Sequence, residues 1–187
     1  MSESIRTFIA LELSTEAKEE LARIISELEK ADAIVKWVDP KTVHLTLKFL
    51  GSIPEEKVLG ISEKLKKIAS STRPFDIGLS GVGVFPTWDH IKVIWAGVSE
   101  GALESKALAE KIDKAMHEEG FDREKRAFSP HLTLGRMKSV RNKDELKNRA
   151  KSLQVNPVKS HITSIVFFRS DLTPEGAVHT PLYSAEL

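Results

Sequence analysis

The sequence His-Leu-Thr-Leu occurs twice in the chain, at residues 44–47 and again at residues 131–134. Alternate side chains of an extended strand share a face, so each copy is predicted to point its histidine and threonine one way and its two leucines the other. The leucines would anchor both strands in a core, while two imidazoles and two hydroxyls face a common cleft. Histidine has an unperturbed pKa near neutrality, so two histidines can divide general-acid and general-base duties.

Coincidence and metal binding are the competing interpretations of this repeat. A single copy could arise by chance in a half-buried strand, but two copies in the same residue order argue against chance. Histidine is the commonest metal ligand, yet the chain has no cysteine and neither copy carries a carboxylate or a second histidine at ligand spacing. Threonine is also a poor ligand for zinc or copper. We therefore expect no metal and no other cofactor.

Composition narrows the class of protein. The chain has 187 residues, of which 41% are apolar, and we expect one two-lobed domain spanning residues 1–187. Because 28 basic residues are balanced by 27 acidic ones, any nucleic-acid contact should come from a local patch. The first 13 residues show no signal-peptide pattern, and no apolar run approaches the length of a membrane span. We expect a cytoplasmic monomer that does not contact a membrane.

The predicted elements follow a repeated order in which each half of the chain contributes one His-x-Thr strand. This order suggests an ancient duplication with pseudo-twofold symmetry, which would place the two histidines opposite each other. Gly51 is expected to end the first motif strand, and Pro54 is expected to open the following helix. Outside the two motif strands, we expect strands at residues 5–13, 34–38, 75–85, 91–98, 158–168 and 178–185, and helices at 15–31, from 54, at 103–119 and at 143–152.

Segments along nearly the whole chain resemble one known family. The sequence is similar to the LigT-like RNA 2′,3′-cyclic phosphodiesterases, also called 2′-5′ RNA ligases, of the two-histidine phosphoesterase superfamily. The segments that carry the resemblance are RTFIA at 6–10, VKWV at 35–38, HLTLKFLG at 44–51, GVFP at 83–86, WAGV at 95–98, SPHLTLGR at 129–136 and SDLTPEG at 170–176.

The resemblance implies a fold and a reaction. The fold would be α+β and bilobal, each lobe an antiparallel sheet backed by helices, with the active-site cleft between the lobes. The reaction would be metal-independent hydrolysis of a 2′,3′-cyclic phosphate end of RNA to a 2′-phosphate, with His44 as the acid toward the 3′ oxygen and His131 as the base. The same geometry would also join such an end to a 5′-hydroxyl and form a 2′-5′ linkage, in a reversible ligation.

Four further residues are candidates for substrate binding. Thr46 and Thr133 place hydroxyls beside the histidines, and Arg136 offers a planar fork suited to phosphate oxygens. Phe49 could stack on the terminal base or serve as plain core. Arg136 should also favour the neutral form of His131. His44 is expected to lie further from the charge of Arg136, with Lys48 four residues after it in sequence, and to keep its proton to higher pH.

Other histidines and basic residues receive plainer interpretations. His161 begins a third His-x-Thr sequence without the fourth apolar residue, and we interpret it as an ordinary strand histidine. His90, His117 and His179 are expected on the surface or in loops. The basic loop at 123–126 is either a solvated face or a contact for a phosphate backbone at the cleft mouth. Two alternative functions stay open: a phosphoesterase acting on small cyclic nucleotides or 2′-5′ oligonucleotides, and a non-catalytic module that binds RNA ends.

Overall fold

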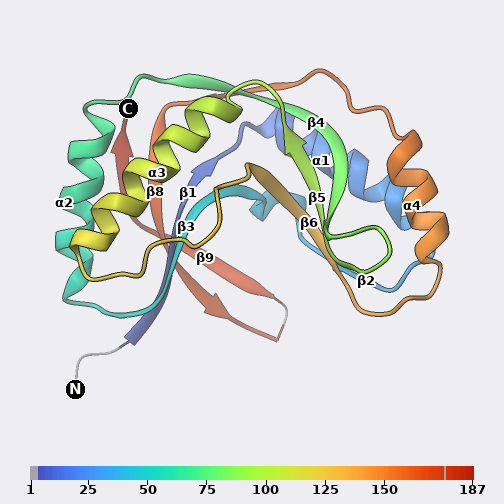
Figure 1. Ribbon diagram of the computed structural model, residues 1–187, viewed down its shortest axis with the longest axis horizontal. Helices are drawn as coiled ribbons and strands as arrows, with labels where there is room; N and C mark the ends of the chain where they lie inside the picture. Colours follow the sequence, from blue (N-terminus) through green and yellow to red (C-terminus); the bar gives the residue numbers. More distant parts are fainter. Residues whose placement is uncertain (1–3, 175) are drawn as a thin grey trace.

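Two antiparallel sheets form the two lobes of the molecule (Figure 1). The computed structural model describes residues 4–174 and 176–187. The first sheet has the order β3-β1-β8-β9, with β1 (Ser4–Glu12), β3 (His44–Pro54), β8 (Ser164–Leu172) and β9 (Ala177–Glu186). The second has the order β2-β6-β5-β4-β7, with β2 (Val35–Trp37), β4 (Phe75–Pro86), β5 (Ile91–Val98), β6 (His131–Met137) and β7 (Lys159–Ile162).

Helices back each sheet on the side away from the other lobe (Figure 1). Helices α2 (Lys57–Ala69) and α3 (Ala102–Glu118) pack on the first sheet, and α1 (Thr15–Glu29) and α4 (Lys143–Ser152) pack on the second. Ser14 caps α1 by accepting a hydrogen bond from the backbone N–H of Ala17. The predicted α+β bilobal fold is confirmed. No helix within the described ranges is long and apolar enough to cross a membrane.

The order of elements repeats, and the two halves exchange a strand. The first series runs β1, α1, β3, α2 and β4, and the second runs β5, α3, β6, α4 and β8. In the first sheet β1 lies between β3 and β8, and in the second β5 lies between β6 and β4. The last strand of each series therefore joins the sheet of the other series. This exchange matches the pseudo-twofold duplication predicted from the repeated tetrapeptide, and it interlocks the lobes.

The leucines of both tetrapeptides lie in one shared core, as the alternation predicts. Leu45, Leu132 and Leu134 have no exposed surface, and Leu47 is 4% exposed. The first motif strand is longer than expected, because residues 52–54 still pair with β1. Gly51 does not end this strand. Its φ of +73° accommodates a shift in the pairing register between β3 and β1. Helix α2 consequently begins at Lys57, not at Pro54.

A buried ion pair joins β3 to α3. Lys48 is 3% exposed, and its ammonium lies 2.7 Å from the carboxylate of Asp113. The same carboxylate accepts from the backbone N–H of Glu124 at 3.1 Å and lies 2.6 Å from Nε of Arg123. Burial raises the pKa of Asp113, but these donors, with Lys48 foremost, outweigh it and hold that pKa below its usual value.

We expect Asp113→Ala to destabilise the protein by about 3–5 kcal/mol, because it leaves the buried ammonium of Lys48 without its counter-charge. Chemical denaturation monitored by circular dichroism measures the change. Glu27→Ala, which breaks the exposed ion pair between Glu27 and Lys30, serves as the control and should leave the midpoint nearly unchanged. Equal midpoints for the two variants would contradict the assigned role of the buried pair.

Candidate active site

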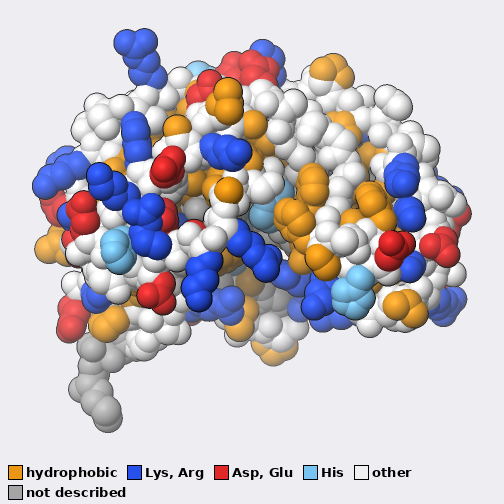
Figure 2. Space-filling view, in the orientation of Figure 1, with side chains coloured by type: hydrophobic (Ala, Val, Ile, Leu, Met, Phe, Trp, Pro, Cys, Tyr) orange, Lys and Arg blue, Asp and Glu red, His pale blue; other side chains and the backbone are white. Residues whose placement is uncertain are grey.

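The two motif strands approach each other where the lobes meet. Strand β3 is the edge of the first sheet, and β6 lies one strand from the edge of the second. Each strand pairs along its tetrapeptide with the strand that opens its own series, β1 for β3 and β5 for β6. Figure 2 shows a hollow between the lobes in which a histidine side chain is visible, with Lys and Arg side chains grouped beneath it.

Both motif histidines are held in the same way by a backbone carbonyl two residues earlier. Nδ1 of His44 lies 2.9 Å from the carbonyl oxygen of Thr42, and Nδ1 of His131 lies 2.8 Å from that of Ser129. A carbonyl can only accept, so Nδ1 carries a proton in each ring. The neutral form of each imidazole therefore has its lone pair on Nε2, and both rings are fixed in orientation.

Each motif strand contains a β-bulge at the last leucine of its tetrapeptide. The register shifts leave Leu47 unpaired in β3 and Leu134 unpaired in β6. One extra residue inverts the alternation of side chains beyond it. The residue five positions after each histidine thereby returns to the face of that histidine. These residues are Phe49 and Arg136, and both are exposed.

Ring contacts confirm the inversion in β3. Phe8 stacks on His44 with centroids 4.7 Å apart and also lies 6.1 Å from Phe49, so the three rings share one face. Lys48 points the other way, into the buried ion pair. Lys48, four residues after His44 in sequence, therefore does not lie beside its ring, because the bulge and the burial of Lys48 direct the ammonium to Asp113.

An aromatic floor lies under His44. Phe8 and Phe168 stack with centroids 5.1 Å apart, and the ring of His179 meets that of His44 edge-on at 5.2 Å. His179 was expected on the surface or in a loop, but it lies half-buried on β9, and its Nδ1 is buried with no hydrogen-bond partner in the described part of the chain. Its isolated place in the sequence gave no signal, because β9 and β3 are opposite edge strands of the first sheet and only the folded sheet brings the two rings together.

The floor changes the acid–base character of His44. Burial lowers the pKa of His44 to about 4, against the hydrogen bond to Thr42, and the charges of His179 and Lys18 lower it further. His44 is therefore neutral at pH 7 in the unliganded protein. The expectation that His44 keeps its proton to higher pH is wrong, because desolvation by the aromatic rings dominates.

The second motif histidine has a different aromatic environment. Phe85 meets His131 edge-on with centroids 5.0 Å apart, and Trp95 lies 6.4 Å from it. The Trp95 ring covers Gly83, where an added Cβ would clash with the ring, so Trp95 packs against β4. Its indole Nε1 is nevertheless buried and lacks a partner among the described residues.

Two cations lie side by side near His131. Lys36 of β2 is directly opposite Arg136 in the ladder, and both are exposed. Val35 and Trp37 flank Gly135 on the other face, which leaves Lys36 on the face of Arg136. Like charges directly opposed repel, and no acidic side chain within the described ranges pairs with either cation. This position suits an anion, and Lys36 is a candidate that the sequence reasoning did not single out.

The other predicted residues lie either beside the motif histidines or far from them. Thr46 and Thr133 are half-buried beside their histidines, as alternation predicts. His161 lies on β7, at the far edge of the second sheet, where it contacts Asp76 at 2.7 Å. The described residues contain no group of three histidine, cysteine or carboxylate side chains placed to hold a metal ion.

These features define a two-lobed phosphoesterase, and comparison with known families assigns the chain. The model of the LigT like phosphoesterase family matches residues 11–95 and 97–179, so the chain belongs to that family.

Named relatives resemble the chain in sequence, and solved structures resemble it in fold. The RNA 2′,3′-cyclic phosphodiesterase of Methanothermobacter thermautotrophicus is 36% identical over 179 residues, covering 95% of this chain and 96% of that protein. The protein of the same name from Aquifex aeolicus is 32% identical over 179 residues, with 94% of each chain covered. The crystal structure of a Thermus thermophilus protein, TT0787, superposes with a TM-score of 0.79 at 27% identity, covering 98% of each chain. The structure of E. coli LigT complexed with 3′-AMP shares the fold, with a TM-score of 0.79 at 23% identity and 99% of each chain covered.

We expect the lowered pKa of His44 to make the protein less stable in acid. Between about pH 6.5 and pH 4 the unfolded chain binds a proton at this position and the folded chain does not, so the free energy of unfolding falls as the pH falls. His44→Gln removes this term and should flatten the slope in that window. Denaturant titrations at several pH values measure it, with His161→Gln as the exposed control. Identical slopes for wild type and His44→Gln would contradict the assigned burial.

Proposed function

We propose that this protein is an RNA 2′,3′-cyclic phosphodiesterase in which His44 and His131 open the cyclic phosphate and leave a 2′-phosphate. The observation that carries the proposal is the matched pair of His-x-Thr strands, with both rings fixed through Nδ1 and Nε2 left free. The names of the full-length relatives support the same activity. The protein acts as a cytoplasmic monomer on RNA ends or cyclic nucleotides, without a cofactor.

The two histidines divide the proton transfers. His131 accepts a proton from water as the water oxygen bonds to phosphorus, and His44 donates a proton from Nε2 to the 3′ oxygen as the bond from phosphorus to that oxygen breaks. Each turnover leaves His131 protonated and His44 neutral, and exchange with solvent restores both. A 5′-hydroxyl that attacks phosphorus in place of water forms a 2′-5′ linkage, with the same 3′ oxygen leaving, and attack of that 3′-hydroxyl on the linkage reverses the step.

The phosphoryl charge needs donors that are already in place. The hydroxyls of Thr46 and Thr133 donate to the non-bridging oxygens, and Arg136 binds them with its planar fork, with Lys36 beside it. A bound anion relieves the repulsion between these two cations. Because the imidazoles, hydroxyls and cations supply both proton transfer and charge neutralisation, the proposed reaction needs no metal ion.

The acid duty of His44 depends on the bound substrate. Burial keeps this ring neutral in the free protein, but a phosphate anion beside it favours the protonated form. Substrate binding should therefore be accompanied by proton uptake at His44. An imidazolium held in an apolar site is also a strong acid, which favours transfer of its proton to the departing oxygen.

Replacing either histidine by alanine should lower the rate about 10²–10⁴-fold, because each change removes one proton-transfer group. The double variant should lose much less than the product of the two single losses, since the pair acts as a unit. The measurement is hydrolysis of 2′,3′-cyclic nucleotides and cyclic-phosphate-ended RNA in excess chelator, with His161→Ala as the control that retains turnover. Full activity of either single variant removes that histidine from the mechanism, and activity that requires a divalent ion overturns the metal-free chemistry.

The roles can be separated with a substrate in which sulfur replaces the bridging 3′ oxygen. A thiolate leaves without being protonated, so His44→Ala should recover most of its rate on this substrate. His131→Ala should stay slow, because the attacking water still needs a base. Rates of both variants on the oxygen and sulfur substrates provide the comparison. Rescue of His131→Ala instead would reverse the two roles.

A further inference from the structure

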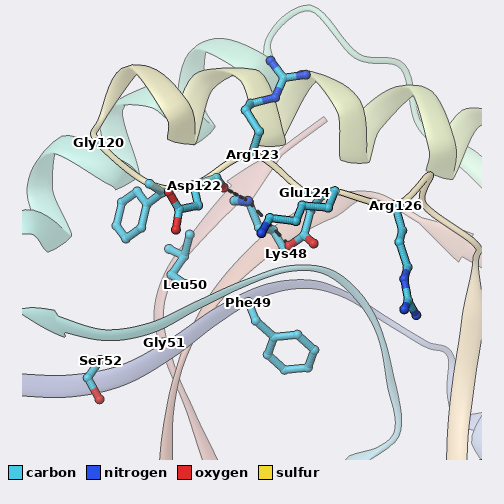
Figure 3. A pocket seen from close by; sticks show the side chains of 12 residues that line it. Lys48, Phe49, Leu50, Gly51, Ser52, Gly120, Asp122, Arg123, Glu124 and Arg126 are labelled. Atoms are coloured by element: carbon cyan, nitrogen blue, oxygen red, sulfur yellow. Dashed lines mark hydrogen bonds and ion pairs between the residues drawn. The ribbon is translucent and has the colours of Figure 1, made fainter.

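A groove of about 690 Å³ lies beside the histidine cleft, between β3 and the loop at residues 120–126 (Figure 3). One wall is the part of β3 from Lys48 to Ser52, and the other is the loop. The two walls lead into the two motif strands, because β3 starts at His44 and the loop comes shortly before His131. The two walls of the groove are therefore close in sequence to the strands that carry His44 and His131.

The loop wall is held in place although it contains no helix or strand. Asp113 binds it through the backbone N–H of Glu124 and the guanidinium of Arg123. Lys48 reaches from the opposite wall to Asp113 and also donates to the carbonyl of Asp122 at 3.0 Å. Figure 3 shows Lys48 beneath the loop at the centre of this network. A wall fixed in this way is preorganised, so a ligand need not order it on binding.

Two cations and one aromatic ring stay free on the open side of the groove. Lys125 and Arg126 are exposed, and neither pairs with an acid in the described part of the chain, whereas Arg123 and Lys48 both form ion pairs with Asp113. The ring of Phe49 is 61% exposed. Figure 3 shows Phe49 and Arg126 extending from opposite walls toward the same space.

An exposed ring beside free cations is the combination that binds single-stranded nucleic acid. Bases stack on the ring while Lys and Arg follow the phosphates. A duplex keeps the faces of its bases stacked inside the helix, so it cannot offer a base to Phe49. An acidic peptide would use the cations but would leave the ring without a matching flat partner.

We propose that this groove binds the single-stranded RNA that precedes the cyclic phosphate, with a base on Phe49 and backbone phosphates at Lys125 and Arg126. The inference rests on the proposed function and narrows its substrate class from cyclic nucleotides in general to RNA chains. A cyclic mononucleotide has no preceding phosphate, and it leaves Lys125 and Arg126 without a partner.

The double variant Lys125→Ala/Arg126→Ala separates chain binding from chemistry. On a short RNA with a 2′,3′-cyclic phosphate end, kcat/KM should fall about tenfold through KM, and its slope against salt on logarithmic axes should become shallower by about 1.4 for two lost contacts to a single strand. On 2′,3′-cyclic AMP the variant should match wild type. The control is Lys66→Ala/Lys67→Ala, at the far end of α2, which removes the same number of exposed lysine or arginine charges away from the groove.

The possible results separate a failure of the groove as an RNA site from a failure of the proposed reaction. An equal loss on the RNA and on the mononucleotide, or the same loss in the control variant, overturns the groove as an RNA site. If wild type hydrolyses neither substrate, the proposed function fails, and fluorescence anisotropy with a 3′-phosphate-ended RNA tests the groove alone. In that assay, weaker binding by Lys125→Ala/Arg126→Ala than by the control variant supports the groove as an RNA site. Equal binding by the two variants overturns it.

Discussion

One unpaired leucine in each motif strand determines which side chains reach the cleft. The bulges at Leu47 and Leu134 invert the alternation, so Arg136 faces solvent and Gly135 faces the core. Without the bulge the guanidinium would point into a packed layer where an added Cβ already comes within 2.7 Å of Val35. The same inversion in β3 buries Lys48 and exposes Phe49. The bulge in β6 places the cation, and the bulge in β3 places the aromatic ring and the loop anchor.

Burial serves different ends at two polar groups of β3. Lys48 is buried with its charge matched by Asp113, and it fixes a loop. His44 is half-buried against the rings of Phe8 and Phe168, and burial lowers its pKa to about 4. The first arrangement fixes the loop, and the second keeps the imidazole neutral. The aromatic floor of Phe8 and Phe168 is therefore an electrostatic element as well as a packing one.

The sequence predicted the features that depend on periodicity and missed those that depend on pairing. The repeated tetrapeptides and the order of the elements predicted the duplication and the burial of the motif leucines, and the family resemblance predicted the two lobes and the antiparallel sheets. Alternation could not reveal the bulges, because an unpaired leucine is indistinguishable from a paired one in sequence. The position of Lys36 opposite Arg136 could not be predicted for a related reason, because strand register joins residues far apart in the sequence. The contact of His179 with His44 joins the two edge strands of the first sheet, which no sequence pattern brings together.

The strand exchange between the halves bears on how such a protein could arise. Two separate copies of one half, each donating its last strand to the other, would form a closed dimer with a dyad through the cleft. Such a dimer must carry the same residue five positions after both histidines, because its subunits are identical. Joining the halves in one chain removes that constraint and permits Phe49 on one side and Arg136 on the other. Asymmetric recognition of a nucleotide, by its base at one strand and its phosphate at the other, is open only to the fused chain.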